Sequence, residues 1–398
     1  MSNNENKLVP KLRFPEFKDN GEWGKKKLGE LCDYWNGASH EKGVSDEGDY
    51  FLLSLNSIDI DGNLKSDMKK LSYTDNSLQR NDLVMVLSDV AHGNFLGLTD
   101  IIPTERYVLN QRMARLRIRD LNEVNPYFLR AYINKSQKYF KRKGQGSSQL
   151  NLAKSSVTGF PIIIPPKKQE QQKIAACLSS LDKVITAENQ KLELLKEHKK
   201  GLLQNLFPQE GETVPKLRFK EFENSGEWEE KELGSFCNSL SSGNDKNFED
   251  GEYELYGSTG VIGRTDNASY EGAFILVARV GANAGYLNKV KGKFGVTDNT
   301  LVIDLNKKDL VNFIFYSLES VGLNKLVFGS GQPLITGGEL KSFLILIPSS
   351  EKEQQKIAET LSSLDDLITA QSQRIEALKM HKKGLLQGLF PNVNEVTK

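Results

Sequence analysis

The sequence predicts an α+β fold in which two β-rich domains are separated by two long antiparallel coiled-coil helices, arranged as a tandem repeat with pseudo-two-fold symmetry. Three observations lead to this prediction. Two blocks of the 398-residue chain recur with most letters unchanged. The segments between these blocks alternate strand-like apolar runs with glycine turns. One recurring block carries a long apolar heptad pattern, which is typical of a coiled coil.

The repeat defines the domain organisation. Residues 9–32 return at 214–237 with 15 of 24 identical, and residues 170–208 return at 353–391 with 28 of 39 identical. Self-similarity of this kind indicates a duplicated structural unit. The predicted divisions are a first β-rich domain with its lead-in segment at 1–165, a first helix at 166–208, a second β-rich domain with its lead-in segment at 209–348, and a second helix with a tail at 349–398.

The two segments between the repeated blocks show no clear sequence similarity to each other, but they carry the same kinds of secondary-structure element. The predicted strands are FLLSL, DLVMVLSDV and FPIIIPP in the first, and AFILVARVG, TLVIDL and FLILIP in the second. Each segment also predicts one helix. Asn125 caps the first helix and Pro126 begins it, and the run DLVNFIFYSLES at 309–320 is its counterpart.

The repeated helices carry nearly five heptads, interrupted by polar residues at Glu188 and Lys199 in the first copy and at Gln371 and Lys382 in the second. A parallel pairing in register would bring Lys199 against Lys382, so we expect an antiparallel pair within one chain. If paired residue numbers sum to 570, Glu188 faces Lys382 and Lys199 faces Gln371. A polar layer of this kind can fix the register of a coiled coil.

Charge and composition limit the classes of function that this chain can have. Formal net charge is +1, which counts against a simple nucleic-acid binder. Eleven Lys or Arg lie between Arg106 and Lys143, however, against only Asp120 and Glu123, so this stretch is either a solvated charged face or a phosphate-facing surface. Three cysteines and four histidines show no metal-ligand spacing, and we expect no metal site. The N-terminus has no apolar signal core, so we expect a cytoplasmic protein.

No catalytic motif is complete, so we expect no catalytic residues. NPYF at 125–128 lacks the second proline of an adenine methyltransferase motif, and a helix start explains it. GSTGVIG at 257–263 fits neither a P-loop nor a dinucleotide-binding fingerprint and is better explained as a turn between strands.

Four features together resemble the specificity subunit of type I restriction–modification systems. They are the helix pair EQQKIA…KKGLLQ-x-LFP, the lead-in PKLRF-x-EF…GEW…LG, the run from YELYGSTGVIGRT to AFILVARVGANAG, and the loops GSSQLNL at 146–152 and GSGQPLI at 329–335. The resemblance implies that each β-rich domain is a target-recognition domain reading one half of a bipartite DNA site. It implies a non-catalytic subunit whose helices set the spacing and dock two methyltransferase subunits, with endonuclease-translocase subunits joining them.

The same resemblance implies that S-adenosylmethionine, ATP and Mg²⁺ belong to the partner subunits and that this chain holds no cofactor. The helix pair, roughly 50 Å long at 1.5 Å per residue, suits two domains reading half-sites about 34 Å apart. Unlike domains should read unlike half-sites, so the DNA site should be asymmetric.

Base readout needs Arg, Asn, Gln, Ser or Thr side chains that reach the groove edges. We expect them on a strand VLNQRMARLRI, on the loop KRKGQGSSQLN and at comparable places of the second domain. The DNA-binding candidates are Arg112, Lys141, Arg142, Lys143, Gln145, Ser147, Ser148, Gln149, Asn151, Arg279, Asn283, Asp298, Asn299, Ser330 and Gln332. Ordinary turn chemistry is the competing explanation for the Ser and Gln positions.

Two other classes of function remain open at this point. A structural adaptor would pair its helices between chains, bind proteins through its two domains and show no DNA preference. A self-contained methyltransferase would have to bind S-adenosylmethionine by itself, and the incomplete motifs argue against it.

Overall fold

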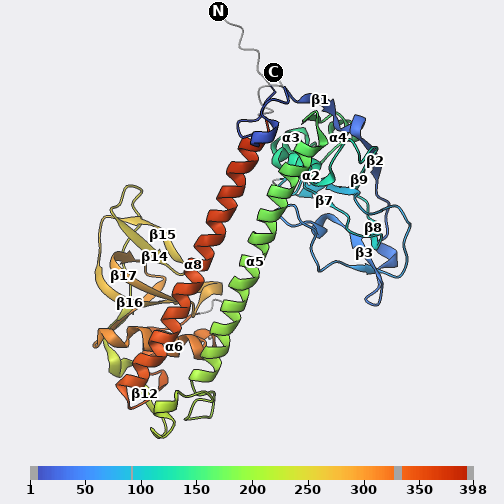
Figure 1. Ribbon diagram of the computed structural model, residues 1–398. Coiled ribbons are helices and arrows are strands. Elements are labelled where there is room, and N and C mark those ends of the chain that lie inside the picture. Colours follow the sequence, from blue (N-terminus) through green and yellow to red (C-terminus); the bar gives the residue numbers. More distant parts are fainter. Residues whose placement is uncertain (1–7, 91–92, 327–333, 392–398) are drawn as a thin grey trace, which may run out of the picture. The chain divides into compact units, whose positions relative to one another are not determined.

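The computed structural model describes residues 8–90, 93–326 and 334–391 (Figure 1). The chain divides into two compact units, one made of residues 1–187 and 375–398 and the other of residues 188–374. Each unit contains one β-rich domain and one half of each long helix. The mixture of sheets with two long helices confirms the predicted fold class.

The first unit is built from short strands and four shorter helices, besides its halves of the two long helices. Its strands are β1 (Gly24–Lys27), β2 (Cys32–Asn36), β3 (Tyr50–Leu53), β4 (Lys70–Leu71), β5 (Leu83–Val86), β6 (Ser88–Val90), β7 (Thr99–Ile101), β8 (Tyr107–Leu109), β9 (Met113–Ile118), β10 (Gln149–Asn151) and β11 (Pro161–Ile164). Its shorter helices are α1 (Leu28–Leu31), α2 (Pro126–Lys135), α3 (Gln137–Lys143) and α4 (Lys154–Thr158). As predicted, the Asn125 side chain caps α2 by accepting the Phe128 N–H at 3.0 Å.

The strands of the first unit form four small sheets. The largest has the order β2-β9-β5-β7, a second has the order β4-β3-β8, and β1-β11 and β10-β6 are two-stranded. The predicted strand VLNQRMARLRI is wrong as a single element, because β8 and β9 are separate strands. Between them Arg112 adopts a φ of 69°, which a continuing strand cannot accommodate.

In the second unit a single six-stranded sheet dominates, in the order β13-β18-β16-β17-β14-β15, and β12 pairs with β19. The strands are β12 (Glu229–Glu232), β13 (Cys237–Ser242), β14 (Tyr253–Gly257), β15 (Gly260–Thr265), β16 (Tyr270–Ala278), β17 (Leu287–Val296), β18 (Thr300–Leu305) and β19 (Leu344–Ile347). The shorter helices are α6 (Val311–Val321) and α7 (Gly337–Lys341). The predicted strands and the helix counterpart in this domain are confirmed.

The long helices are α5 (Lys168–Leu206) and α8 (Glu351–Leu389). Their heptad positions are buried or half-buried, as in the seam of a coiled coil. In the first unit Ile174 and Leu178 of α5 share a core with Leu389 at the far end of α8, which requires the two helix halves to run antiparallel. In the second unit Leu206 of α5 and Leu361 of α8 share the corresponding core, again antiparallel.

The lead-in segments, residues 9–32 and 214–237, each bond to the end of a long helix in their own unit. In the first unit the Leu12 N–H donates to the carbonyl of Gly388, near the end of α8, at 2.8 Å. In the second unit the Leu217 N–H donates to the carbonyl of Asn205, near the end of α5, also at 2.8 Å. The N-terminal lead-in therefore packs on the second helix, although in sequence it is linked to the first.

Candidate nucleic-acid interface

The basic loop of the first unit connects α3 to β10. Gln145, Ser147 and Ser148 are exposed along it, and Arg142 and Lys143 are exposed at the end of α3 just before it, as a nucleic-acid interface requires. Lys141 is held differently, because its ammonium group donates to the Asn94 side chain at 2.9 Å. The loop is anchored at its base, where the backbones of Gln145 and Asn151 bond to each other at 2.8 and 3.0 Å.

Gln149 and Asn151 lie on β10, which pairs antiparallel with β6. The Ser88 hydroxyl donates to the Asn151 side-chain oxygen at 2.6 Å, and the Asn151 amide donates to the Gln149 carbonyl at 3.1 Å. The Asn151 side chain therefore holds the loop together, which is the turn chemistry that competed with base readout. Gln149 differs, since its side-chain nitrogen is buried without a hydrogen-bond partner among the described atoms.

The turn at Arg112 lies close to the end of this loop, although the two segments are far apart in sequence. Its backbone carbonyl accepts the Leu87 N–H at 2.9 Å, and the Leu87 carbonyl accepts the Leu152 N–H at 2.8 Å. The exposed Arg112 turn is thus linked through one residue to the end of β10. The fold brings these candidates of the first domain together.

The basic run from Arg106 to Lys143 does not form one phosphate-facing surface. Several of its arginines are ion-paired within the unit: Arg106 with Asp49, Arg117 with Asp82, Arg119 with Asp33, and Arg130 with Asp100. The Arg115 guanidinium lies over the ring of Trp35 and donates to the Ser77 carbonyl at 2.6 Å. Counting charges along the sequence could not show this, because the acidic partners come from distant segments.

In the second unit the candidates gather at one end of the six-stranded sheet. Arg279 follows β16, and its N–H donates to the Asn299 carbonyl at 3.1 Å. Asp298 and Asn299 are exposed in the turn between β17 and β18. Asn283, exposed in the turn after Arg279, accepts the Tyr286 N–H at 2.9 Å. Ser330 and Gln332 lie outside the described residues.

Two residues at these sites were not predicted. Ser258, in the turn between β14 and β15, donates its hydroxyl to the same Asn299 carbonyl at 3.2 Å. Ser88 bonds to Asn151 in the first unit. Ser258 could have been found, because it belongs to the GSTG turn that the sequence marks. Ser88 carried no signal within its strand.

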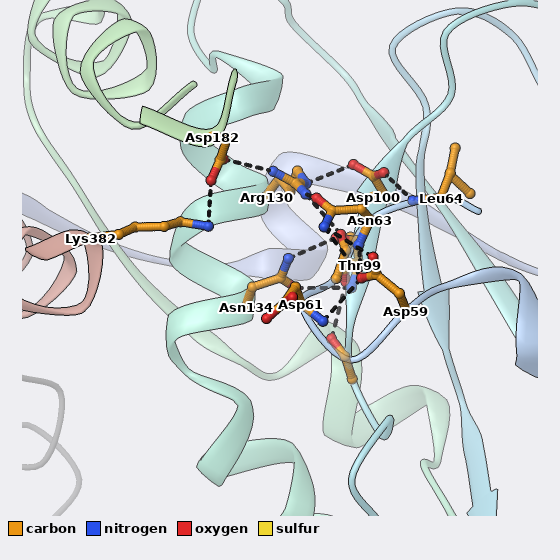
Figure 2. A network of polar contacts seen from close by, with 12 residues as sticks. Asp59, Asp61, Asn63, Leu64, Thr99, Asp100, Arg130, Asn134, Asp182 and Lys382 are labelled. Carbon is orange, nitrogen blue, oxygen red and sulfur yellow. Dashed lines mark hydrogen bonds and ion pairs between the residues drawn. The ribbon is translucent and has the colours of Figure 1, made fainter. Parts of the chain in front are cut away.

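The first domain is joined to the long helices of its unit by a network around Arg130 of α2 (Figure 2). The Arg130 Nε forms an ion pair with Asp100 at 2.6 Å, and Nη1 lies 3.7 Å from Asp182 of α5. Asp182 is in turn paired with Lys382 of α8 at 2.6 Å. Burial raises the pKa of Asp100, and the nearby Arg130 charge opposes that rise.

The second unit uses a related network with different chemistry. Lys199 of α5 pairs with Asp365 of α8 at 2.9 Å and with Glu319 of α6 at 3.0 Å. The Tyr316 hydroxyl donates to Asp365 at 2.6 Å. Burial lowers the pKa of Lys199, but the bonds to Asp365 and Glu319 outweigh it, so the pKa stands above its ordinary value.

The polar residues of the helix seam therefore do not have the predicted partners. Glu188 accepts the Gln371 side-chain amide at 2.6 Å and pairs with Arg374 at 2.9 Å, where Lys382 was expected. Lys199 meets Asp365, six residues before the expected Gln371. The prediction matched interrupted heptad positions only with one another. Glu188 does meet another interrupted position, Gln371, but in a different register. Lys199 and Lys382 pair instead with the flanking carboxylates Asp365 and Asp182.

The comparisons with known proteins bear on this arrangement. The type I restriction modification DNA specificity domain matches residues 20–197 and again residues 225–380. These two matches cover most of the chain. The chain belongs to this family. It is a DNA sequence-recognition subunit of a type I restriction–modification system, and the protein-adaptor alternative loses its support.

Individual relatives agree with the family assignment. Two specificity subunits of Methanocaldococcus jannaschii, MjaX (putative) and MjaVIII, are each 24% identical to this chain. The alignment with MjaX covers 93% of this chain and the alignment with MjaVIII covers 95%, and each covers 93% of the relative's own length. The EcoprrI specificity subunit of Escherichia coli is 30% identical over 115 residues, only 29% of this chain and 28% of that protein.

Solved structures agree in fold. The type I S subunit from M. genitalium has a TM-score of 0.67 at 16% identity, covering 97% of this chain and all of its own. A chain from another type I system has a TM-score of 0.56 at 17% identity, covering 93% of this chain and 98% of its own. Identity this low supports the shared fold only. None of the helices in the described ranges is long and apolar enough to cross a membrane.

Proposed function

We propose that each β-rich domain reads one half of an asymmetric, bipartite DNA site and that the paired long helices set the spacing between the halves. The observation that carries this proposal is the double family match, one copy on each half of the chain, combined with unlike side chains at the two candidate sites. The first site offers Gln145, Ser147 and Ser148 beside lysine and arginine. The second offers Arg279, Asp298 and Asn299.

The chain performs no chemistry of its own in this proposal. Two methyltransferase subunits dock on the long helices, and endonuclease-translocase subunits complete the assembly in the cytoplasm. S-adenosylmethionine, ATP and Mg²⁺ belong to those partners. Exposed apolar side chains on the helices support docking there: Val184 is 43% exposed, and Leu367, its equivalent in the other helix, is 56% exposed. The two positions are equivalent in the repeat, so two copies of one partner would meet the same kind of side chain on each helix.

Long-read sequencing of methylated adenine in the source genome, with and without this gene, tests the proposal. We expect deletion to remove methylation at one gapped motif with two unlike halves. An unchanged methylome from a strain that expresses active partner subunits would contradict it.

Substitutions at the two sites then assign the halves. Gln145→Ala with Ser148→Ala should alter or relax only one half of the motif, because base contacts and not backbone contacts carry the sequence information. Asp298→Ala with Asn299→Ala should affect only the other half, and each pair serves as the control for the other. A change in both halves from either pair would show that the two domains do not read independently.

A further inference from the structure

Five cationic side chains line one hollow in the first unit, beside the loop that carries the candidate base-reading residues. The hollow has a volume of about 720 Å³ and lies between β1, α3 and the start of β11. Lys25, Lys26 and Lys27 of β1 line one side, and Arg142 and Lys143 of α3 line another. These two elements are separated by more than a hundred residues, so the cluster exists only in the folded domain.

Most of this positive charge is not neutralised within the protein. Lys26 is bonded to Glu123. Among the described residues, no carboxylate forms an ion pair with Lys25, Lys27, Arg142 or Lys143. The acidic residue that lines the hollow, Glu30, uses its carboxylate to accept the Lys27 backbone N–H at 3.0 Å. Five cations against the carboxylates of Glu30 and Glu123 leave a net charge of +3 around this concave surface, which creates a local positive potential suited to an anionic ligand.

The second unit shows that the fold does not require these lysines. Its strand β12 pairs antiparallel with β19, as β1 pairs with β11. The residues equivalent to Lys25, Lys26 and Lys27 are Glu230, Lys231 and Glu232. These three positions therefore carry a formal charge of +3 in one unit and −1 in the other. Lysine can protect an exposed strand edge from pairing, but the glutamates of β12 would do so equally well.

We propose that the hollow holds the sugar-phosphate backbone of the duplex that the first domain reads. This inference rests on the proposed function and assigns a backbone-clamping surface to one half-site only. Arg142 and Lys143 directly precede the exposed loop at 145–148, so a duplex contacted by that loop brings its phosphates within reach of the hollow. Phosphate contacts of this kind fix the position of a protein on DNA without reading sequence.

Salt dependence of DNA binding tests the proposal in the complex with its methyltransferase subunits. Two variants remove the charge: Lys25→Glu with Lys27→Glu, which copies the second unit, and Lys25→Ala with Lys27→Ala. The matched controls are Lys42→Glu with Lys65→Glu and Lys42→Ala with Lys65→Ala, which make the same two charge changes at exposed positions of the same unit outside the hollow. The probes are a duplex carrying the methylated motif and a duplex of unrelated sequence.

Loss of two phosphate contacts should reduce the slope of log affinity against log salt by about 1.8. Lowering the salt from about 200 to about 50 mM should then tighten the alanine variant about 12-fold less than the parent. Both duplexes should be affected by the same factor, because the contacts are independent of sequence. The control variants should keep the parental slope.

An unchanged slope in the alanine variant, or an equal change in its matched control, would overturn the proposal. So would loss of a partner subunit from the complex with an unchanged slope, which would assign the hollow to an acidic protein surface. Failure of the proposed function is distinguishable, since the parent complex would then show no preference for the motif duplex over the unrelated one.

Discussion

Replacing Arg130 by methionine should destabilise the first unit by about 3 kcal/mol. The Arg130 and Asp100 side chains are 15% and 17% exposed and lie 2.6 Å apart. The same guanidinium donates to the Gly62 carbonyl at 2.8 Å and to the Asn63 side chain at 2.6 Å (Figure 2). Removing one partner of a buried ion pair typically costs 3–5 kcal/mol. We take about 3 kcal/mol, because solvent still reaches part of this pair.

The loss should depend on pH in a defined direction. Burial already raises the pKa of Asp100, and Arg130 opposes that rise, so removing Arg130 raises the pKa further. A carboxyl group whose folded pKa lies above its unfolded value destabilises the fold once it is ionised. The difference between parent and variant should therefore be largest near neutral pH. It should shrink as the pH falls through the raised pKa of Asp100, because the protonated group no longer needs a cation.

Fluorescence during guanidinium chloride unfolding measures this change. All variants carry Trp228→Phe, which leaves Trp23 and Trp35 as reporters of the first unit, since the chain has three tryptophans. The double variant Arg130→Met with Asp100→Asn is the matched control and should recover much of the loss. A single variant as stable as the parent at neutral pH, or one whose deficit grows in acid, would refute the reasoning.

Two further predictions concern the helices. Arg13 binds Glu170 through two contacts of 2.8 Å, with both side chains almost fully buried, so Arg13→Gln should cost about 3–5 kcal/mol in the same unfolding assay. An unaffected midpoint would show that Glu170 does not depend on this partner. In a background lacking the native cysteines, Glu188→Cys with Gln371→Cys should crosslink readily within one chain. Glu188→Cys with Leu364→Cys should not, because Leu364 lies about 10 Å further along α8; the reverse result would exclude the observed pairing.

Much of the fold could be predicted because its determinants are local or repeated. Strands such as β5, β16 and β19 are apolar runs bounded by turn residues, and α2 begins at an Asn–Pro cap. Antiparallel pairing of α5 and α8 followed from like charges that a parallel pair would bring together. These features depend on neighbouring residues or on two copies of one segment.

The remaining features depend on contacts between distant segments. The turn at Arg112 contains no glycine or proline, so nothing in the sequence indicated its positive φ. The Leu87 N–H, which donates to the Arg112 carbonyl, comes from a distant strand region. Arg117 belongs to the basic run that could have faced phosphate, but it forms an ion pair with Asp82 at 2.7 Å. The helix partners were mispaired for the same reason. Lys199 is satisfied partly by Glu319, a residue of the variable domain that no heptad analysis includes.

The repeated helices present the same ion pair to both domains, and each domain uses it differently. Asp182 with Lys382 and Asp365 with Lys199 occupy equivalent positions of the repeat, and each pair lies within one unit. In the first unit Arg130 approaches the aspartate. In the second unit Glu319 bonds to the lysine. A pair that offers one anion and one cation accepts either charge from the domain packed on it. The variable domains can therefore differ in sequence while the helices that carry them remain nearly identical.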